Sequence, residues 1–248
     1  MRAPVILIPF LLELALLITT LAPLLLPGRI RNRPTLGIFA WVTLLASSLL
    51  ATAAALGLAV WSVVQAWFDL SAPAQPIDDS RRWQIVVLAN FGPWVLLALA
   101  GITFALINLR LEPHLTAARE AHPRIMAATK RIGEFKGVEY RSVASPAFIS
   151  FTTTLGRDQV IVLSTAALDS LSAEELDAVL WHEFAHIRLG HNRLKRSLGL
   201  FANLTSRFLA SRVMAREIEL LCELAADRYA QKHTNRQVLL AARAKFGA

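Results

Sequence analysis

Long uncharged stretches dominate the first 110 residues of the chain. Residues 4–26 contain a single charged residue, Glu13, and residues 34–68 and 83–109 contain none. Each stretch exceeds the roughly 20 apolar residues that a helix needs to cross the hydrocarbon core of a bilayer. None alternates like a barrel strand, and a helix satisfies its own backbone hydrogen bonds in lipid. The pattern predicts three membrane-spanning helices, at about 4–26, 36–68 and 83–109. The first stretch could instead be a signal peptide, but it lacks a small-residue cleavage site and is longer than the usual apolar region, so we expect a retained anchor.

After residue 110 the pattern becomes that of a small soluble domain. Residues 112–135 predict a helix interrupted near Pro123, because proline disfavours the helical conformation of the residue before it. Two segments rich in β-branched and aromatic residues, 145–155 and 159–164, flank the turn-like sequence Gly-Arg-Asp. They predict a β-hairpin.

Beyond this hairpin the apolar period changes from two residues to 3.6. Ser172 and Glu175 have the spacing of a helix capping box, and Gly190 has the position of a helix stop. Between them, apolar residues recur at helical spacing: Leu176, Val179, Leu180, Phe184 and Ile187. The sequence therefore predicts one amphipathic helix from about residue 173 to residue 189.

This predicted helix carries the sequence His-Glu-Phe-Ala-His at residues 182–186. His182 and His186 lie one turn apart on one helix face, as two ligands of one metal ion require. Neutral imidazoles bind zinc, and a catalytic zinc site usually has three protein ligands and one open position. Glu183 would then act as the general base that takes a proton from the attacking water.

A third ligand must come from elsewhere in the chain. His191 is five residues after His186, whereas the three-histidine pattern needs six, so we expect it to point away from the metal. A second predicted helix at 216–231 has an apolar face formed by Ile218, Leu221, Cys222, Ala225 and Tyr229. It also carries Glu219, Glu223 and Asp227 at intervals of four residues. These carboxylates are the better candidates.

Composition indicates a membrane environment, and the charges of the loops predict an orientation in it. Hydrophobic residues make up 55% of the chain and mean hydropathy is +0.47, above the roughly 45–50% apolar content of soluble domains. Loop 28–34 has three arginines and no acid, whereas loop 69–82 has three aspartates and two arginines. The positive-inside rule then places loop 28–34 and the region after residue 109 in the cytoplasm and the N-terminus outside.

The net charge of +8 is consistent with this topology and with anionic lipid headgroups as partners. No basic-aromatic module indicates direct nucleic-acid binding. The single cysteine, Cys222, permits no intrachain disulfide, which agrees with a reducing compartment. Its apolar surroundings predict a buried small residue and not a catalytic thiol.

The motif "HEFAH", followed thirty-seven residues after His186 by Glu223 in "ELAAD", resembles the membrane-embedded gluzincin zinc metalloproteases. Two groups share this plan, the BlaR/MecR-like peptidases and the HtpX and CAAX-prenyl-protease group. The resemblance covers roughly residues 145–230. It implies that Glu223 is the third zinc ligand, with Glu219 as the alternative, and that Asp227 orients a ligand histidine. His233 is a weaker candidate for stabilising the oxyanion.

The predicted spans and orientation resemble the BlaR/MecR group more than the HtpX group. Sensor-transducers of that group also carry an extracellular penicillin-binding domain, for which the sequence shows no counterpart, so we do not expect inducer recognition. Residues 197–206 are uncharged but too short to cross a membrane, and the basic residues around them favour an interfacial helix.

These inferences give one overall expectation. The chain is an α-helical integral membrane protein with three spans in residues 1–110 and a cytoplasmic α+β zincin-like metalloprotease domain in residues 111–248. It resides in the plasma membrane, holds one Zn²⁺ per chain and hydrolyses peptide bonds in protein or peptide substrates. The substrate is a transcriptional repressor under regulated cleavage or, alternatively, membrane proteins under quality control. A non-catalytic zinc-binding scaffold is the third hypothesis, and Glu183 argues against it because structural zinc sites need no base. The sequence predicts no cleavage specificity, activating signal or oligomeric state.

Overall fold

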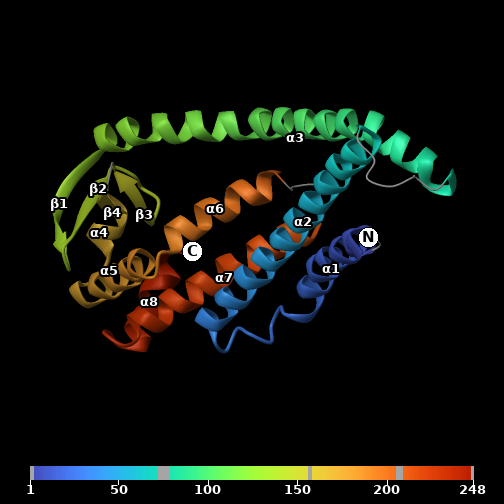
Figure 1. Ribbon diagram of the computed structural model, residues 1–248. Coiled ribbons are helices and arrows are strands. Elements are labelled where there is room, and N and C mark those ends of the chain that lie inside the picture. Colours follow the sequence, from blue (N-terminus) through green and yellow to red (C-terminus); the bar gives the residue numbers. More distant parts are fainter. Residues whose placement is uncertain (1–2, 72–78, 156–157, 205–208, 247–248) are drawn as a thin grey trace. The chain divides into compact units, whose positions relative to one another are not determined.

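The computed structural model describes residues 3–71, 79–155, 158–204 and 209–246 (Figure 1). The described residues form eight helices and one four-stranded sheet. They divide into two compact units. The first unit contains residues 1–27 and 39–110, and the second contains residues 28–38 and 111–248. The sequence had placed segment 28–38 in the membrane domain, whereas its contacts belong to the second unit.

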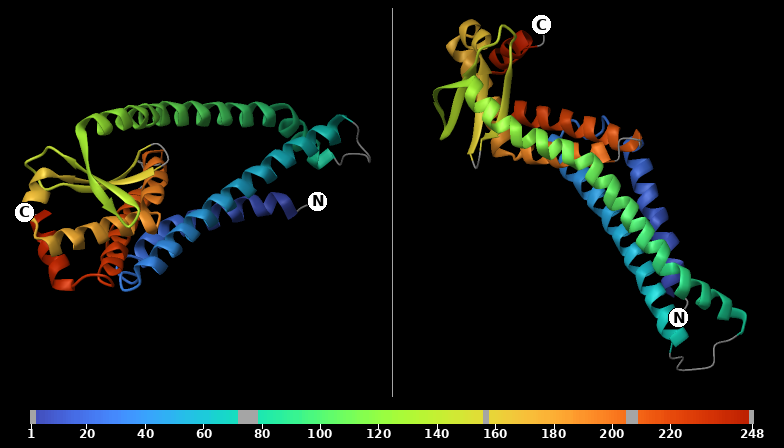
Figure 2. Two further views of the ribbon diagram at one scale, coloured as in Figure 1. Left: turned by 90° about the vertical axis from the view of Figure 1, so that its left-hand side faces the viewer. Right: turned by 90° about the horizontal axis from the view of Figure 1, so that it is seen from above.

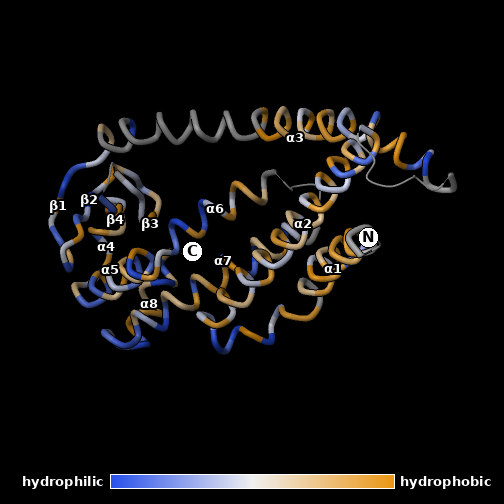
Figure 3. Tube along the Cα trace, in the orientation of Figure 1, coloured by the Kyte–Doolittle hydropathy of each residue, from blue (hydrophilic) through white to orange (hydrophobic). Residues whose placement is uncertain are grey.

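The first unit is built from apolar helices. They are α1 (Ala3–Leu25), most of α2 (Pro34–Ser71) and the first part of α3 (Asp79–Ala128). Hydrophobic residues predominate along α1, α2 and this part of α3, with paler, less hydrophobic positions between them (Figure 3). Two helical segments in the described chain are long and apolar enough to cross a membrane, Pro34–Ser71 and Arg82–Ile107.

The apolar surface of these two segments is largely uncovered by protein. Only 17% and 11% of their most apolar windows are buried, so they are not core helices of a soluble domain. This supports two of the three predicted spans. The continuous apolar part of α1 is shorter, Leu7–Ala22, and the first span stays a prediction.

Small residues bring these helices together. Buried alanines include Ala15, Ala51, Ala55 and Ala89. Ser48 Oγ donates to the backbone oxygen of Ala15 at 3.4 Å, which joins α2 to α1. A Cβ on Gly92 would lie 2.7 Å from Val63, so only glycine permits this approach of α3 to α2. Close backbone approach at small residues is the usual way in which helices pack in lipid.

The second unit contains the sheet. Its strands are β1 (Thr129–Phe135), β2 (Val138–Val143), β3 (Ser150–Leu155) and β4 (Asp158–Ser164), in the spatial order β1-β2-β4-β3. β2 and β4 pair in parallel, and the other two pairs are antiparallel. The predicted hairpin is confirmed as the β3–β4 pair, although residues 156 and 157 of its turn lie outside the described residues. β3 therefore forms one edge of the sheet (Figure 2).

The prediction for residues 112–135 was wrong in two respects. The helix α3 is not interrupted at Pro123 but continues to Ala128, since loss of one backbone N–H does not by itself end a helix whose neighbouring bonds persist. The last seven residues form strand β1 instead of helix. Lys136 and Gly137 both have positive φ angles, 52° and 80°, and so form the tight turn that pairs β1 with β2.

Five helices complete the second unit. They are α4 (Thr165–Ser170), α5 (Ala173–Arg188), α6 (His191–Leu204), α7 (Leu209–Ala230) and α8 (Arg236–Phe246). Helix α5 is the central element, because it contacts β3, β4, α6, α7 and α8. Helices α6 and α7 lie side by side (Figure 2). Residues 205 and 206 of the predicted interfacial stretch lie outside the described residues.

The predicted start and end of α5 are confirmed. Ser172 Oγ accepts from the backbone N–H of Glu175, and the Glu175 carboxylate accepts from the backbone N–H of Ser172. Gly190 has a φ of 71°, a conformation that glycine adopts without strain. The apolar face of α5 packs on the sheet in a core that contains Ile161, Leu163, Val179, Leu180 and Ala242. Because this face packs on the sheet, the opposite side of α5 faces α6 and α7.

Candidate metal centre

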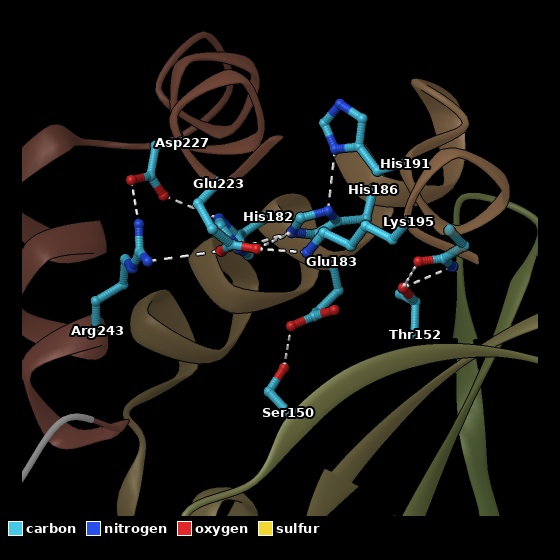
Figure 4. Close-up of polar contacts among 11 residues, drawn as sticks. Ser150, Thr152, His182, Glu183, His186, His191, Lys195, Glu223, Asp227 and Arg243 are labelled. Carbon is cyan, nitrogen blue, oxygen red and sulfur yellow. Dashed lines mark hydrogen bonds and ion pairs between the residues drawn. The ribbon is translucent and has the colours of Figure 1, made fainter. Parts of the chain in front are cut away.

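Three potential metal ligands converge where α5 meets α7 (Figure 4). His182 and His186 project from one face of α5, and Glu223 projects from α7. One ligand atom from each lies within 4.8 Å of the others. Both histidines are buried, and the carboxylate is partly exposed. The structure therefore brings together three side chains that the sequence had suggested from two separate helices.

The spacing of the three groups fits a tetrahedral metal ion. His182 Nε2 lies 3.2 Å from His186 Nε2. Glu223 Oε2 lies 3.3 Å from His182 Nε2, and Glu223 Oε1 lies 3.5 Å from His186 Nε2. Ligands at about 2.0–2.1 Å from a tetrahedral zinc ion are about 3.3–3.4 Å from one another. The donor set of two imidazoles and a carboxylate also suits zinc.

Each histidine is held from its other ring nitrogen. His182 Nδ1 lies 2.9 Å from Asp227 Oδ1, one turn after Glu223 on α7. Both atoms are buried, and neither has another hydrogen-bond partner in the described chain. This contact therefore compensates for the burial of both polar atoms. His186 Nδ1 lies 3.0 Å from Nδ1 of the buried His191. The two outer contacts turn both Nε2 atoms inward, which is the usual arrangement behind metal-binding histidines.

Two cations contact the carboxylates of α7. Lys195 Nζ, from α6, lies 2.8 Å from Glu223 Oε1. Arg243, from α8, pairs with Asp227 and lies 3.7 Å from Glu223 Oε2. In Figure 4, Arg243 approaches the two carboxylates from the side opposite the histidines, whereas Lys195 reaches Glu223 alongside His186.

Glu183 lies between the three convergent residues and the edge strand. It is buried, and its carboxylate accepts a hydrogen bond from Ser150 Oγ at the start of β3. Two residues further along β3, Thr152 is hydrogen-bonded to Asn192, the second residue of α6, at 2.8 Å. The start of α6 and the face of β3 are thereby tied together next to Glu183.

The charges of the site favour a cation among these residues. Burial lowers the pKa of His182, but its contacts with Asp227 and Glu223 outweigh burial and raise the pKa to about 9. Burial would raise the pKa of Glu223, but hydrogen bonds from His182, His186 and Lys195 hold it well below its usual range. The acidic groups therefore stabilise a positive charge at this point, whether a proton or a metal ion.

Other sequence candidates lie apart from this cluster. Glu219 is exposed. His233 stacks on Trp181 with a ring-centroid distance of 3.9 Å, and none of its described contacts is with the convergent residues. Burial raises the pKa of Cys222 to about 11, so its thiol stays protonated and unreactive.

Sequence reasoning missed several contacts of the site, among them those of His191, Lys195 and Arg243. His191 had been considered only as a ligand; it is not among the three convergent residues, but it contacts His186. Lys195 had been assigned to a basic cluster at the membrane surface. Arg243 had no signal in the sequence, because it belongs to a helix that is joined to the site only through the tertiary fold.

Comparison with known proteins gives a family match. The sequence profile of peptidase family M48 matches residues 119–242, which is half of the chain and includes His182, Glu183, His186, Glu223 and Asp227. No curated protein matches the chain. Among solved structures, the crystal structure of Ste24p from S. mikatae aligns with 83% of this chain at 18% identity and a TM-score of 0.33. The chain spans 58% of the length of that protein. On the extent of the profile match, the chain belongs to peptidase family M48.

Proposed function

We propose that this protein is a membrane-bound, zinc-dependent endopeptidase of the gluzincin type. The observation that carries the proposal is the convergence of His182, His186 and Glu223 next to the buried carboxylate of Glu183. The three convergent residues would hold one Zn²⁺ per chain. Asp227, which lies 2.9 Å from His182 Nδ1, would keep that imidazole in the tautomer whose Nε2 lone pair faces the metal.

The proposed reaction is hydrolysis of a peptide bond by water. Zinc in such a site supplies a Lewis acid that polarises a carbonyl and lowers the pKa of water. Glu183 takes a proton from the attacking water and gives it to the leaving amine, which yields a carboxylate and a free amine. Before reaction, the hydrogen bond from Ser150 holds the Glu183 carboxylate in position.

The positive charge nearest the site is a candidate for stabilising the oxyanion. Lys195 Nζ lies within 2.8 Å of a proposed ligand oxygen, whereas His233 is stacked on Trp181. We therefore assign this electrostatic role to Lys195 in preference to His233.

The free edge of β3 is the proposed binding surface for the substrate backbone. Within the described residues β3 pairs only with β4, on one side, and its first residue contacts Glu183. A substrate that adds to this edge as an extended strand would run past the base, and its recognition would depend mainly on main-chain hydrogen bonds.

The membrane part of the proposal follows from the sequence. We propose three spans in residues 1–110, a cytoplasmic protease domain in residues 111–248, an outside N-terminus and residence in the plasma membrane, on the charges of the two loops. In this topology a soluble transcriptional repressor is the proposed substrate. The repressor hypothesis is supported by the span arrangement alone, because the family match is to M48 and not to the BlaR/MecR group. Sequencing of new protein N-termini in cells with active or inactive enzyme distinguishes it from the alternative, in which the cleaved bonds lie in membrane proteins.

The catalytic proposal is tested with Glu183→Gln in the full-length protein in detergent. Hydrolysis of a quenched fluorescent peptide library should fall by about 100-fold or more, since a general base contributes that much. Zinc content should stay at the wild-type level because Glu183 is not a ligand. Glu219→Gln, an exposed carboxylate on α7, is the matched control and should keep full activity. Substantial hydrolysis by the Glu183→Gln protein would exclude the general-base role.

A further inference from the structure

A cavity distinct from the metal centre lies in the second unit, between the start of α2 and the far side of α7. Its volume is about 290 Å³, and its lining includes Pro34, Thr35, Ala225, Arg228 and Lys232. Ala225 is two residues after Glu223, so it lies about 200° around the helix from that residue. The cavity therefore belongs to a different face of α7 from the proposed ligands.

The walls of the cavity are held in place by contacts of segment 28–38. Arg31 Nη2 lies 2.5 Å from the buried Glu217 of α7. A Cβ on Gly37 would lie 3.0 Å from Leu221 Cδ1, so glycine lets the first turn of α2 approach α7 closely. This ion pair and this close approach fix the start of α2 against α7 and leave the cavity between them.

The cavity has an apolar floor and a basic rim. Pro34 and Ala225 are buried apolar residues, while Arg228 and Lys232 are exposed. The side chains of Arg228 and Lys232 form no ion pair within the described chain, and no lining residue is acidic. Thr35 lies in the first turn of α2, where backbone N–H groups have no acceptor within the helix. The basic rim, the lack of acidic residues in the lining and these N–H groups favour an anionic ligand group.

The position of the cavity along the chain points to lipid as the source of that group. Pro34 is the first residue of a candidate membrane span of 38 residues. Since roughly 20 residues cross the hydrocarbon core, the first turns of α2 have length to spare and can lie at headgroup depth. The volume is near the lower end of the roughly 300–1,000 Å³ typical of small-molecule pockets, which suits a headgroup and not a whole lipid.

We propose that this cavity, with Arg228 and Lys232 at its rim, binds the phosphate headgroup of an anionic phospholipid where α2 enters the bilayer. Anionic lipids are concentrated in the cytoplasmic leaflet, the side to which the arginines of loop 28–34 assign this end of α2. The bound lipid would tie the second unit to the membrane surface at one defined point. The site is independent of peptide-bond hydrolysis.

The test measures lipid binding to the full-length protein in detergent by native mass spectrometry. Phosphatidylglycerol should bind at least 10-fold more tightly than phosphatidylcholine with the same chains. Arg228→Gln/Lys232→Gln should weaken phosphatidylglycerol binding by about 30-fold, the expected effect of two basic groups at a lipid headgroup. Equal binding of the two lipids by the wild-type protein would overturn the proposal.

Two further variants separate a defined pocket from diffuse charge. Arg212→Gln/Arg216→Gln removes two exposed arginines with the same four-residue spacing on α7, away from the cavity, and should change binding by less than about 2-fold. Thr35→Tyr keeps every charge but fills the cavity and should weaken binding as strongly as the rim variant does. An equal loss in the control pair, or unchanged binding by Thr35→Tyr, would contradict a pocket. Full displacement of the lipid by glycerol 3-phosphate would make a soluble phosphate the ligand and overturn the lipid assignment.

Discussion

Glu223 and Asp227, one turn apart on α7, have different partners and therefore different roles. Glu223 faces both Nε2 atoms, whereas Asp227 contacts Nδ1 of His182 and is paired with Arg243. The first position suits a ligand, and the second suits a group that orients a ligand. At the scale of single residues, the account therefore separates binding of the metal from positioning of its ligands.

Asp227→Asn should weaken zinc binding without abolishing it. The amide keeps the size of the side chain but loses the negative charge that supports His182, and loss of such a partner typically costs 10–100-fold in metal affinity. Competition with a chromophoric chelator measures the change. Asp177→Asn, an exposed carboxylate on α5, is the control and should bind zinc as the wild-type protein does. A zinc affinity of Asp227→Asn equal to that of the wild type would remove the positioning role.

The sequence predicted some of these residues and not others, for a physical reason. His182, Glu183 and His186 share one helix turn, so spacing alone reveals them. Glu223 was chosen from a resemblance. Spacing alone does not single it out, because Glu219 lies four residues before it on the same helix. Arg243, Lys195 and Ser150 reach the site from three different elements, and their contacts depend on packing that no local pattern contains.

At the scale of elements, α5 depends on its N-terminal capping box. Ser172→Ala removes the acceptor for the backbone N–H of Glu175, and such a loss typically costs about 1 kcal/mol of stability. The melting temperature of the purified protein should fall accordingly. Ser170→Ala, whose hydroxyl makes no hydrogen bond within the described residues, should leave it unchanged. Equal melting temperatures for Ser172→Ala and the wild type would show that α5 is stabilised by packing alone.

The other half of the capping box predicts a pH dependence. A hydrogen bond from Lys245, at 2.7 Å, and the backbone N–H of Ser172 lower the pKa of Glu175 from its ordinary value of 4.5. Ionised Glu175 therefore stabilises the fold above about pH 4.5, and this contribution is lost as the pH falls through the lowered folded-state pKa. Glu175→Gln should melt below the wild type at pH 7, and the difference should disappear in acid. Glu174→Gln, at the exposed neighbouring position, is the control. A difference in melting temperature between Glu175→Gln and the wild type that does not change with pH would contradict the assignment.

Elements with a clear local pattern were the ones that the sequence predicted well. The β3–β4 hairpin is rich in β-branched and aromatic residues on both sides of a turn-like sequence, and α5 has a clear period of 3.6 residues. Strand β1 was missed because its seven residues carry only two large apolar side chains, Ile132 and Phe135, and its register shifts between Arg131 and Gly133. A bulged edge strand has little alternation to detect.

At the scale of the whole molecule, the loop charges predict which side of the membrane each segment faces. Cysteines introduced by Asn32→Cys and Arg236→Cys, both at exposed positions, should react with an impermeant maleimide only after the cells are opened. Ser71→Cys, also exposed, should react in intact cells and serves as the matched control. Labelling of Asn32→Cys in intact cells would reverse the topology and exclude a cytoplasmic repressor as substrate.

The zinc site is the central claim, and zinc content per chain tests it most directly. Elemental analysis of the full-length protein, purified in detergent, should give close to one zinc per chain for the wild type and for Glu219→Ala. It should give little zinc for His186→Ala and Glu223→Ala. Absence of zinc from a folded wild-type protein that has been exposed to zinc would contradict the metal centre. Loss of zinc in Glu219→Ala but not in Glu223→Ala would show that Glu219, and not Glu223, is the third ligand.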